Sequence, residues 1–200
     1  MIIAAKGMLI GLSIAAPVGP IGLLCMKRAL NQGRRYGLAS GLGAATADGL
    51  YGLAAAFGFD AATAWLLAAQ DAVSAVGGLF LCYLGWRTFR SGADDGGAAA
   101  RSGSLAGAYW TTFALTIANP ATILSFLGIF AGLNVVDASA FRLLTLVGGI
   151  FAGSAFWWLG LSLTVGALRR TLKPAAMRQI NRLSGLLLAG FGLYALLRLL

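Results

Sequence analysis

One carboxylate lies near the middle of a long apolar segment. Asp48 is the only ionisable side chain near the centre of any apolar run in this chain. A charge at the centre of a bilayer costs about 2.5–3.5 kcal/mol on insertion scales, so such a residue usually faces the bundle interior or a wet cavity. There its carboxylate can meet a substrate amine, a proton or both. The alternative is a structural Asp that is protonated or hydrogen-bonded.

Tyr51 follows Asp48 by three residues and therefore shares its helical face. Its hydroxyl is placed to orient the carboxylate. A plain core tyrosine explains the spacing equally well.

The first apolar run is interrupted at its centre by two prolines and a glycine. Pro17 and Pro20 lack backbone N–H groups and clash with the carbonyl four residues back, so a helix cannot run straight through them. With Gly19 between them, they free carbonyls before the break and start a new helix after it. The new N-terminus carries a partial positive charge and unpaired N–H groups, which suit a substrate carboxylate. The alternative is a proline kink that binds nothing.

A second interruption, Asn119-Pro120, follows about a hundred residues later. Asn119 adds an amide that both donates and accepts hydrogen bonds. Hydroxyl side chains near the two breaks and near Asp48 are expected chiefly to pair with freed carbonyls. These residues are Ser13, Thr46, Thr116 and Ser154. Two breaks and one buried acid together predict a central polar site.

The composition predicts an integral membrane protein. Of 200 residues, 59% are hydrophobic and only 10% are charged, against about 25% charged in soluble domains. There is no histidine, and the two cysteines lie inside apolar runs, so we expect no zinc, no haem and no other cofactor. No nucleophile–base pair lies at membrane depth, which disfavours an enzyme. The net charge of +9 resides in basic loops between apolar runs, which indicates membrane topology and not nucleic-acid binding.

Six apolar runs are close to or longer than the length of about 20 residues that crosses a bilayer. They are Ile3–Met26, Tyr36–Phe59, Ala72–Phe89, Ala108–Leu133, Phe141–Leu168 and Leu183 to the end. Twelve Lys and Arg residues lie in the loops and span ends of one side, and three, Lys6, Arg142 and Arg198, lie on the other. Because short basic loops stay in the cytoplasm, this bias predicts that both termini lie outside it.

The two halves of the chain resemble each other. Residues 16–17 correspond to 119–120, and residues 43–48 to 149–154, at offsets of 103 and 106. Glycines extend the match at an offset of 107, pairing Gly78 with Gly185 and Gly85 with Gly192. A duplicated unit with three spans must insert upside down the second time. The expected fold is therefore all-α, with six transmembrane helices in two inverted three-helix repeats and with helices 1 and 4 broken.

In this arrangement the first repeat covers 1–90, a polar Gly/Ala-rich linker covers 91–107, and the second repeat covers 108–200. Paired interruptions at matching positions of an inverted repeat are the strongest sequence indication of a transporter binding site. Glycines at small-xxx-small spacing predict close helix packing within the subunit. A homodimer that forms through such faces is the alternative interpretation.

Several segments resemble the LysE/RhtB family of amino acid exporters. The opening segment 14–20 (IAAPVGP), with 33–38 (GRRYGL) and 41–43 (GLG), is similar to that family's first motif. The segment 115–120 (LTIANP) resembles its Asn-Pro motif, and 83–87 (YLGWR) resembles the end of its third span. The last span, around 185–192, is also similar, so the resemblance covers nearly the whole chain.

The resemblance implies a multi-pass permease of the bacterial inner membrane that exports amino acids, driven by the proton gradient. It implies that the central site is lined by Pro17, Gly19, Pro20, Asn119 and Pro120. It also implies an acid at the position of Asp48, the candidate for proton coupling.

The leading hypothesis is thus a secondary exporter of amino acids or close analogues, with proton entry in exchange. No second acid is visible at membrane depth, which favours a neutral or small cationic cargo. The alternative is an exporter of a divalent cation such as manganese, although one Asp, one Asn and backbone carbonyls form a thin ligand set. A third class is a membrane protein that transports nothing; the two symmetric breaks count against it.

Overall fold

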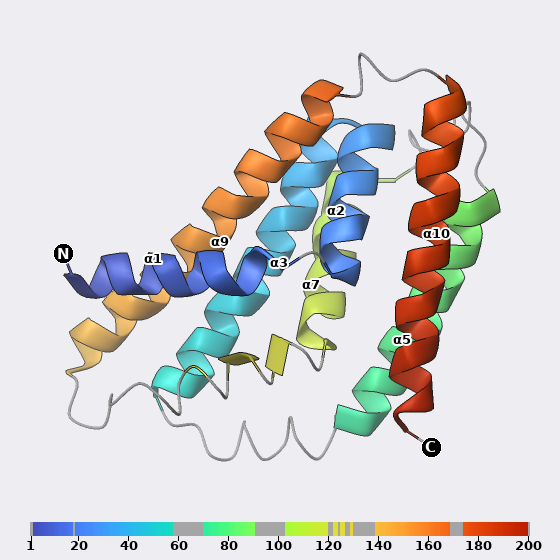
Figure 1. Ribbon diagram of the computed structural model, residues 1–200. Coiled ribbons are helices and arrows are strands. Elements are labelled where there is room, and N and C mark those ends of the chain that lie inside the picture. The colour runs from blue at the N-terminus through green and yellow to red at the C-terminus, as the bar shows by residue number, and fades with distance from the viewer. Residues whose placement is uncertain are drawn as a thin grey trace.

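A computed structural model describes residues 2–17, 19–57, 70–90, 103–119, 122–123, 125–126, 129, 139–168 and 174–199. All regular structure in these ranges is helical (Figure 1). The helices are α1 (Ile2–Ala15), α2 (Pro20–Asn31), α3 (Arg34–Ala56), α5 (Gln70–Arg90), α7 (Leu105–Ile117), α9 (Ala140–Leu168) and α10 (Pro174–Leu197). The all-helical class expected from the sequence is confirmed.

Length and composition allow two helices of this described part to cross a membrane, Ala140–Leu168 and Ala175–Leu197. The pair α1 and α2 is bent by 83° at its junction and makes a third if it counts as one span. α7 is apolar but shorter. α3 and α5 coincide with the second and third expected spans and are helical, although they do not pass the same test.

Two boundaries differ from the expectation. α10 begins at Pro174, nine residues before the expected start, so Arg178 and Arg182 lie on a helix and not in a loop. Proline is favoured at the first helical position, where its missing N–H costs nothing. α2 likewise continues past Met26 to Asn31.

Glycines bring α1 and α9 into direct backbone contact. A Cβ added at Gly11 would lie 2.0 Å from the carbonyl oxygen of Ile150, and one at Gly153 would lie 2.1 Å from that of Met8. Gly7 and Gly149 meet in the same way one turn further along. The small-xxx-small spacings in these two helices are therefore used inside the subunit, as expected.

α5 and α10 form a separate antiparallel pair beside the other helices (Figure 1). A Cβ at Gly85 would lie 2.7 Å from the carbonyl oxygen of Gly185, and one at Gly192 would lie 2.6 Å from that of Gly78. Two helices in such close backbone contact form one packed unit.

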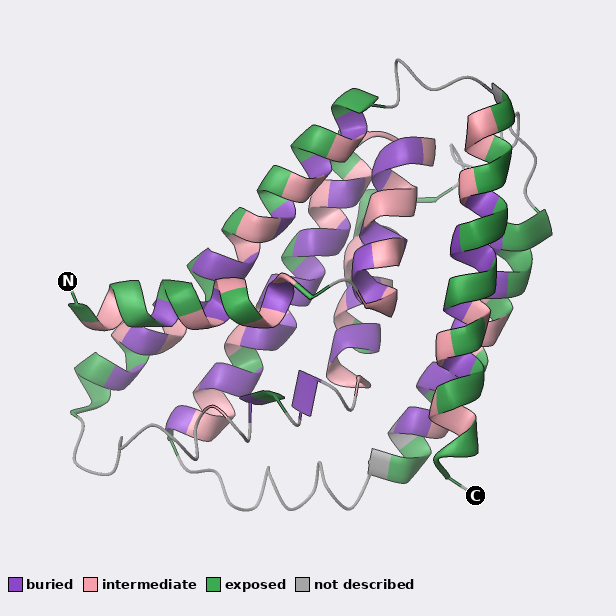
Figure 2. Cartoon of the chain, in the orientation of Figure 1, coloured by how far each residue is buried: buried purple, intermediate pink, exposed green. Residues whose placement is uncertain are grey.

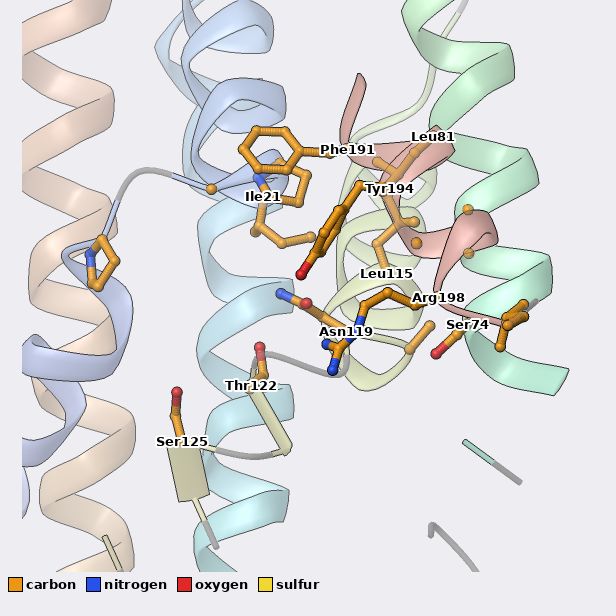
Figure 3. A pocket seen from close by; sticks show the side chains of 18 of the residues that line it. Ile21, Ser74, Leu81, Leu115, Asn119, Thr122, Ser125, Phe191, Tyr194 and Arg198 are labelled. Atoms are coloured by element: carbon orange, nitrogen blue, oxygen red, sulfur yellow. The ribbon is translucent and has the colours of Figure 1, made fainter. Parts of the chain in front are cut away.

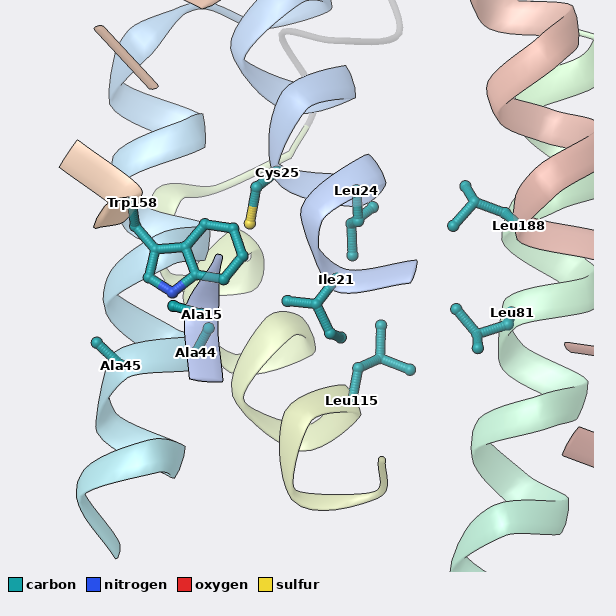
Figure 4. Packing of buried hydrophobic residues seen from close by; sticks show 10 residues of the cluster. All are labelled: Ala15, Ile21, Leu24, Cys25, Ala44, Ala45, Leu81, Leu115, Trp158 and Leu188. Carbon is teal, nitrogen blue, oxygen red and sulfur yellow. The ribbon is translucent and has the colours of Figure 1, made fainter. Parts of the chain in front are cut away.

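The main apolar cluster connects this pair to the rest. Leu81 and Leu188 come from α5 and α10, and they face Ile21 and Leu24 of α2 (Figure 4). On the other side of α2, Trp158 of α9 closes the cluster. α2, the short helix after the first break, is therefore the element between the two groups of helices.

Each long helix has exposed as well as buried residues (Figure 2), and many of the exposed residues carry large apolar side chains. Val76 is 70% exposed, Trp110 60% and Phe156 62%. Exposed apolar side chains on several helices are what a surrounding membrane covers. A lipid bilayer around the helices accounts for them.

Arg28 fixes the end of α2 to two neighbouring helices. Its Nη1 donates to Ser40 Oγ, Thr112 Oγ1 and the carbonyl oxygen of Ala108, each at 2.8 Å. Its Nη2 donates to Thr111 Oγ1 at 2.7 Å. The sequence places this cation in a basic loop, whereas the structure makes it a half-buried link among α2, α3 and α7.

Candidate functional site

Asp48 lies buried on α3, facing α9. Its side chain is 3% exposed, and its Oδ2 accepts a 2.6 Å hydrogen bond from Ser154 Oγ. Trp158 Nε1 in turn donates to Ser154 Oγ at 3.1 Å. Because the single hydroxyl proton of Ser154 points at Asp48, the indole fills the acceptor side of that hydroxyl and fixes the direction of the bond. The carboxylate is thus held in place by a chain of two donors from one turn of α9.

The first break leaves a helix start beside this carboxylate. α1 ends at Ala15, and α2 begins after Gly19 with Pro20 at its first position and without a side-chain cap. The first bond of the new helical ladder joins Leu23 N–H to the carbonyl oxygen of Gly19 at 3.0 Å. The N–H groups that precede this bond belong to the electropositive end of α2.

The second break follows α7. Asn119 donates its backbone N–H to the carbonyl oxygen of Thr116 at 3.1 Å. Its own carbonyl accepts the N–H groups of Thr122 and Ile123, at 3.0 and 3.2 Å, so the chain turns there into a new helical segment. Pro120 lies outside the described residues.

A small compartment brings both breaks to Asp48. It holds about 60 Å³ and is lined by Pro17, Gly19, Pro20, Asp48, Thr116, Asn119 and Trp158, among others. This volume has room for about two water molecules but not for an organic solute. Of the residues expected to form one central site, the five that the structure describes, Pro17, Gly19, Pro20, Asp48 and Asn119, line this compartment together.

A larger cavity shares the two breaks with this compartment. It holds about 630 Å³ between the breaks and the α5–α10 pair, and its lining includes Pro17, Gly19, Pro20 and Asn119 (Figure 3). Cavities of about 300–1,000 Å³ are typical of small-molecule sites. The arrangement therefore has a chamber for an organic solute and, next to it, a small polar compartment with one acid.

Other hydroxyl residues lie elsewhere. Ser13 is exposed and donates to the carbonyl oxygen of Leu9, at 2.8 Å, within α1. Thr46 donates in the same way to Leu42 and accepts from Tyr109. The Tyr51 hydroxyl donates to the carbonyl oxygen of Ile117, not to Asp48, so it ties α3 to the end of α7.

Thr116, although it lines the small compartment, also donates back to its own helix, to the carbonyl oxygen of Thr112 at 2.8 Å. Ser154 is the hydroxyl of the expected set that meets Asp48.

Trp158 is a further residue of this site. It is 5% exposed and lines the small compartment. Its spacing of four residues from Ser154 on a helix was the available signal. Tyr194, Arg198 and Phe191 of α10 line the larger cavity, and no sequence pattern points to them.

At the other end of α2 the two groups of helices are joined by polar contacts. Lys27 Nζ donates to Thr88 Oγ1 of α5. Asn31 Nδ2 donates to Asn181 Oδ1 of α10 at 3.1 Å. We refer to these four residues as the polar latch. The α5–α10 pair is thus held against α2 at one end and stands apart from the breaks at the end that contains the cavity.

Comparisons with known proteins identify the family of this chain. The family model described as LysE type translocator matches residues 12–199. The protein named "Putative amino acid efflux protein YcgF" of Bacillus subtilis (strain 168) is 30% identical to this chain over an alignment 200 positions long. The alignment covers 92% of this chain and 90% of that protein. No solved structure matches. The chain therefore belongs to the LysE type translocator family of membrane transporters.

Proposed function

We propose that this protein is a secondary active transporter that exports amino acids or close analogues from the cytoplasm across the bacterial inner membrane, in exchange for protons. One observation carries the proposal: both helix breaks and a buried carboxylate line one compartment that adjoins a cavity of about 630 Å³. Family membership and the amino acid efflux relative support the same class of cargo.

In this proposal the substrate binds beside the breaks, with Pro17, Gly19 and Pro20 on one side and Asn119-Pro120 on the other. Its carboxylate faces the electropositive start of α2. Its ammonium, or the exchanged proton, interacts with Asp48. A compartment too small for the whole substrate but large enough for water lets a proton reach Asp48 while the solute stays in the larger cavity.

We further propose six spans in two inverted repeats. If a twofold axis relates the two halves, each contact between two residues is repeated as a contact between the corresponding residues of the other half. At the offset of 107, the contact of Gly78 with Gly192 becomes that of Gly185 with Gly85, and both contacts exist. At the offset of 106, Asp48 and Ser154 are each other's counterparts and touch. These self-consistent pairs support the proposed symmetry.

The polar latch indicates the state of the transport cycle. Lys27 lies at the basic end of α2, next to Arg28, which is the end that we assign to the cytoplasm. There the α5–α10 pair is closed against α2, while the cavity lies at the other end. We therefore propose that this conformation is open away from the cytoplasm and that rocking of the pair opens the cytoplasmic side.

Counterflow in proteoliposomes tests the proposal. Vesicles loaded with single unlabelled amino acids are diluted into trace labelled amino acid, and a parallel set uses manganese. We expect accumulation of at least one amino acid, absent from protein-free vesicles and strongly reduced by Asn119→Leu, which keeps the size of the side chain and removes its amide. Manganese counterflow without any amino acid counterflow would overturn the proposal in favour of a metal exporter.

A further inference from the structure

The α10 helix contributes polar side chains to the larger cavity from the side opposite the two breaks. Tyr194 and Arg198 line that cavity together with Asn119. Figure 3 shows the guanidinium of Arg198 and the ring of Tyr194 extending toward the Asn119 side chain at the end of α7. Three hydrogen-bond donors thus converge from two separate groups of helices.

We propose that Arg198 is a carboxylate-binding residue of this cavity, acting with Tyr194 and Asn119, and that the cargo consists of carboxylates with an uncharged, apolar side chain. This inference rests on the proposed function and extends it, because it names the residue that recognises the carboxylate from the α10 side.

The chemistry of the three groups fits an anion. A guanidinium presents a rigid fork of donors that matches the two oxygens of a carboxylate. A phenol hydroxyl and a side-chain amide add single donors. Arg198 is also placed in advance, since its Cζ lies 5.8 Å from the ring centroid of Tyr194, within cation–π range. The ring and the cation therefore act as one unit on the cavity wall.

Arg198 is the only cation, and Asp71 the only anion, among the residues described as lining this cavity. Since α5 and α10 run antiparallel with Gly78 against Gly192, Asp71 and Arg198 lie at the same end of the pair. An ion pair between them is the competing role for Arg198, and the experiment below includes the variant that isolates it.

Most of the rest of the cavity wall is apolar, and Ser74, Thr122 and Ser125 add hydroxyl groups to it. Ile21, Leu81, Leu115 and Phe191 line it from α2, α5, α7 and α10. A solute whose carboxylate meets Arg198 has this wall available for its side chain. Each further methylene buried there is expected to strengthen binding about fourfold, whereas a charged side chain would lose its hydration against the same wall.

A second competing role follows from the position of Arg198 just after the last residue of α10. A cation there stabilises the helix end whatever the ligand. Such a role predicts that loss of Arg198 weakens the fold and the binding of every ligand alike. A carboxylate-binding role predicts a loss that depends on whether the ligand carries a carboxylate.

The test therefore removes the carboxylate from the ligand and the guanidinium from the protein in turn. Binding to the purified full-length protein is measured by titration calorimetry for leucine, for 3-methylbutylamine, which lacks the carboxylate, and for 4-methylpentanoate, which lacks the amine. The variants are Arg198→Ala and Arg198→Lys, with Arg142→Ala as the matched control. Arg142 lies exposed in the first turn of α9 and does not line the cavity.

We expect Arg198→Ala to weaken leucine and 4-methylpentanoate at least tenfold and 3-methylbutylamine less than twofold. Arg198→Lys should retain part of the affinity, and Arg142→Ala all of it. Equal losses for the three ligands, or no loss, would overturn the inference. The same loss in Asp71→Asn would assign Arg198 to an ion pair instead.

Failure of this inference is distinguishable from failure of the proposed function. Amino acid counterflow that persists unchanged in Arg198→Ala would keep the exporter and remove the carboxylate site. A wild-type protein that shows no counterflow and binds none of the three ligands would overturn both.

Discussion

Ser154 Oγ donates a 2.6 Å hydrogen bond to Asp48 Oδ2 across 106 residues of sequence. The same offset aligns the helix that carries Asp48 with the helix that carries Ser154. If the two halves are related by a twofold axis, this bond lies on it, at the crossing of α3 and α9. One repeat would then supply the acid and the other the hydroxyl that orients it, so that neither half would be a complete site.

Replacing Ser154 by Ala tests the hydrogen bond that orients the Asp48 carboxylate. The change leaves the buried Asp48 Oδ2 and Trp158 Nε1 without their shared partner, and an unsatisfied buried polar group costs about 1–3 kcal/mol. We expect the free energy of unfolding in mixed micelles to fall by that amount. We also expect an imposed pH gradient to accelerate transport less than in the wild type.

Ser162→Ala is the matched control. Ser162 lies on the same helix and is equally buried, but its hydroxyl has no hydrogen-bond partner among the described residues. Its removal should leave both stability and transport close to those of the wild type. Equal losses in the two variants would show that α9 tolerates no loss of a hydroxyl and that the bond to Asp48 is not special.

Glycine substitutions in α9 test the close contact with α1. Gly153→Ala places a methyl group 2.1 Å from the backbone oxygen of Met8, so the helices must separate. Gly160→Ala meets no atom within 4 Å and should be neutral or stabilising by up to about 1 kcal/mol, because alanine favours the helix. Melting temperatures of the purified variants give the comparison. A Gly153→Ala protein as stable as Gly160→Ala would contradict the packing of α1 on α9.

Arg28→Lys tests the half-buried link at the end of α2. Lysine keeps the charge, but a single ammonium cannot reach four acceptors on two helices. Because hydrogen bonds to charged groups contribute about 1.5–3 kcal/mol each, we expect a marked fall in melting temperature. Arg35→Lys, at an exposed position of α3, serves as the control and should melt like the wild type. A melting temperature of Arg28→Lys within error of that control would mean that the link contributes nothing.

The polar latch is tested by a double-mutant cycle. Asn31→Ala and Asn181→Ala each remove one partner of the 3.1 Å bond between α2 and α10. We expect a coupling free energy of about 0.5–1.5 kcal/mol between the two changes, since the second change costs little once the first is made. Additive effects on the free energy of unfolding would show that the two amides do not hold the helices together.

The parts of the site that depend on the backbone could be predicted from the sequence. Proline has no N–H to donate, so the break after Ala15 follows from Pro17 and Pro20 alone, and α1 and α2 are indeed bent by 83° there. The burial of Asp48 also follows from its position in an apolar run. The two breaks and the one buried acid predict one central site, and both breaks line the small compartment that contains Asp48.

The parts that depend on how far a side chain reaches could not be predicted. Arg28 follows Lys27 in what looks like a basic loop, and only the approach of α7 shows that its guanidinium has four acceptors. Tyr51 shares a helical face with Asp48, but its hydroxyl donates to the carbonyl oxygen of Ile117 instead. Arg198 near the end of α10 has no pattern around it, because its cavity forms from helices that are far apart in sequence.

The most direct test of the account compares Asp48→Asn with the wild type in proteoliposomes that carry an imposed pH gradient. Arg142→Ala removes an exposed charge that lines neither the small compartment nor the larger cavity. The account predicts that the gradient accelerates amino acid movement several-fold in the wild type and in Arg142→Ala, and that Asp48→Asn loses this acceleration. Transport by Asp48→Asn that responds to the gradient as the wild type does would contradict the role of Asp48 in coupling.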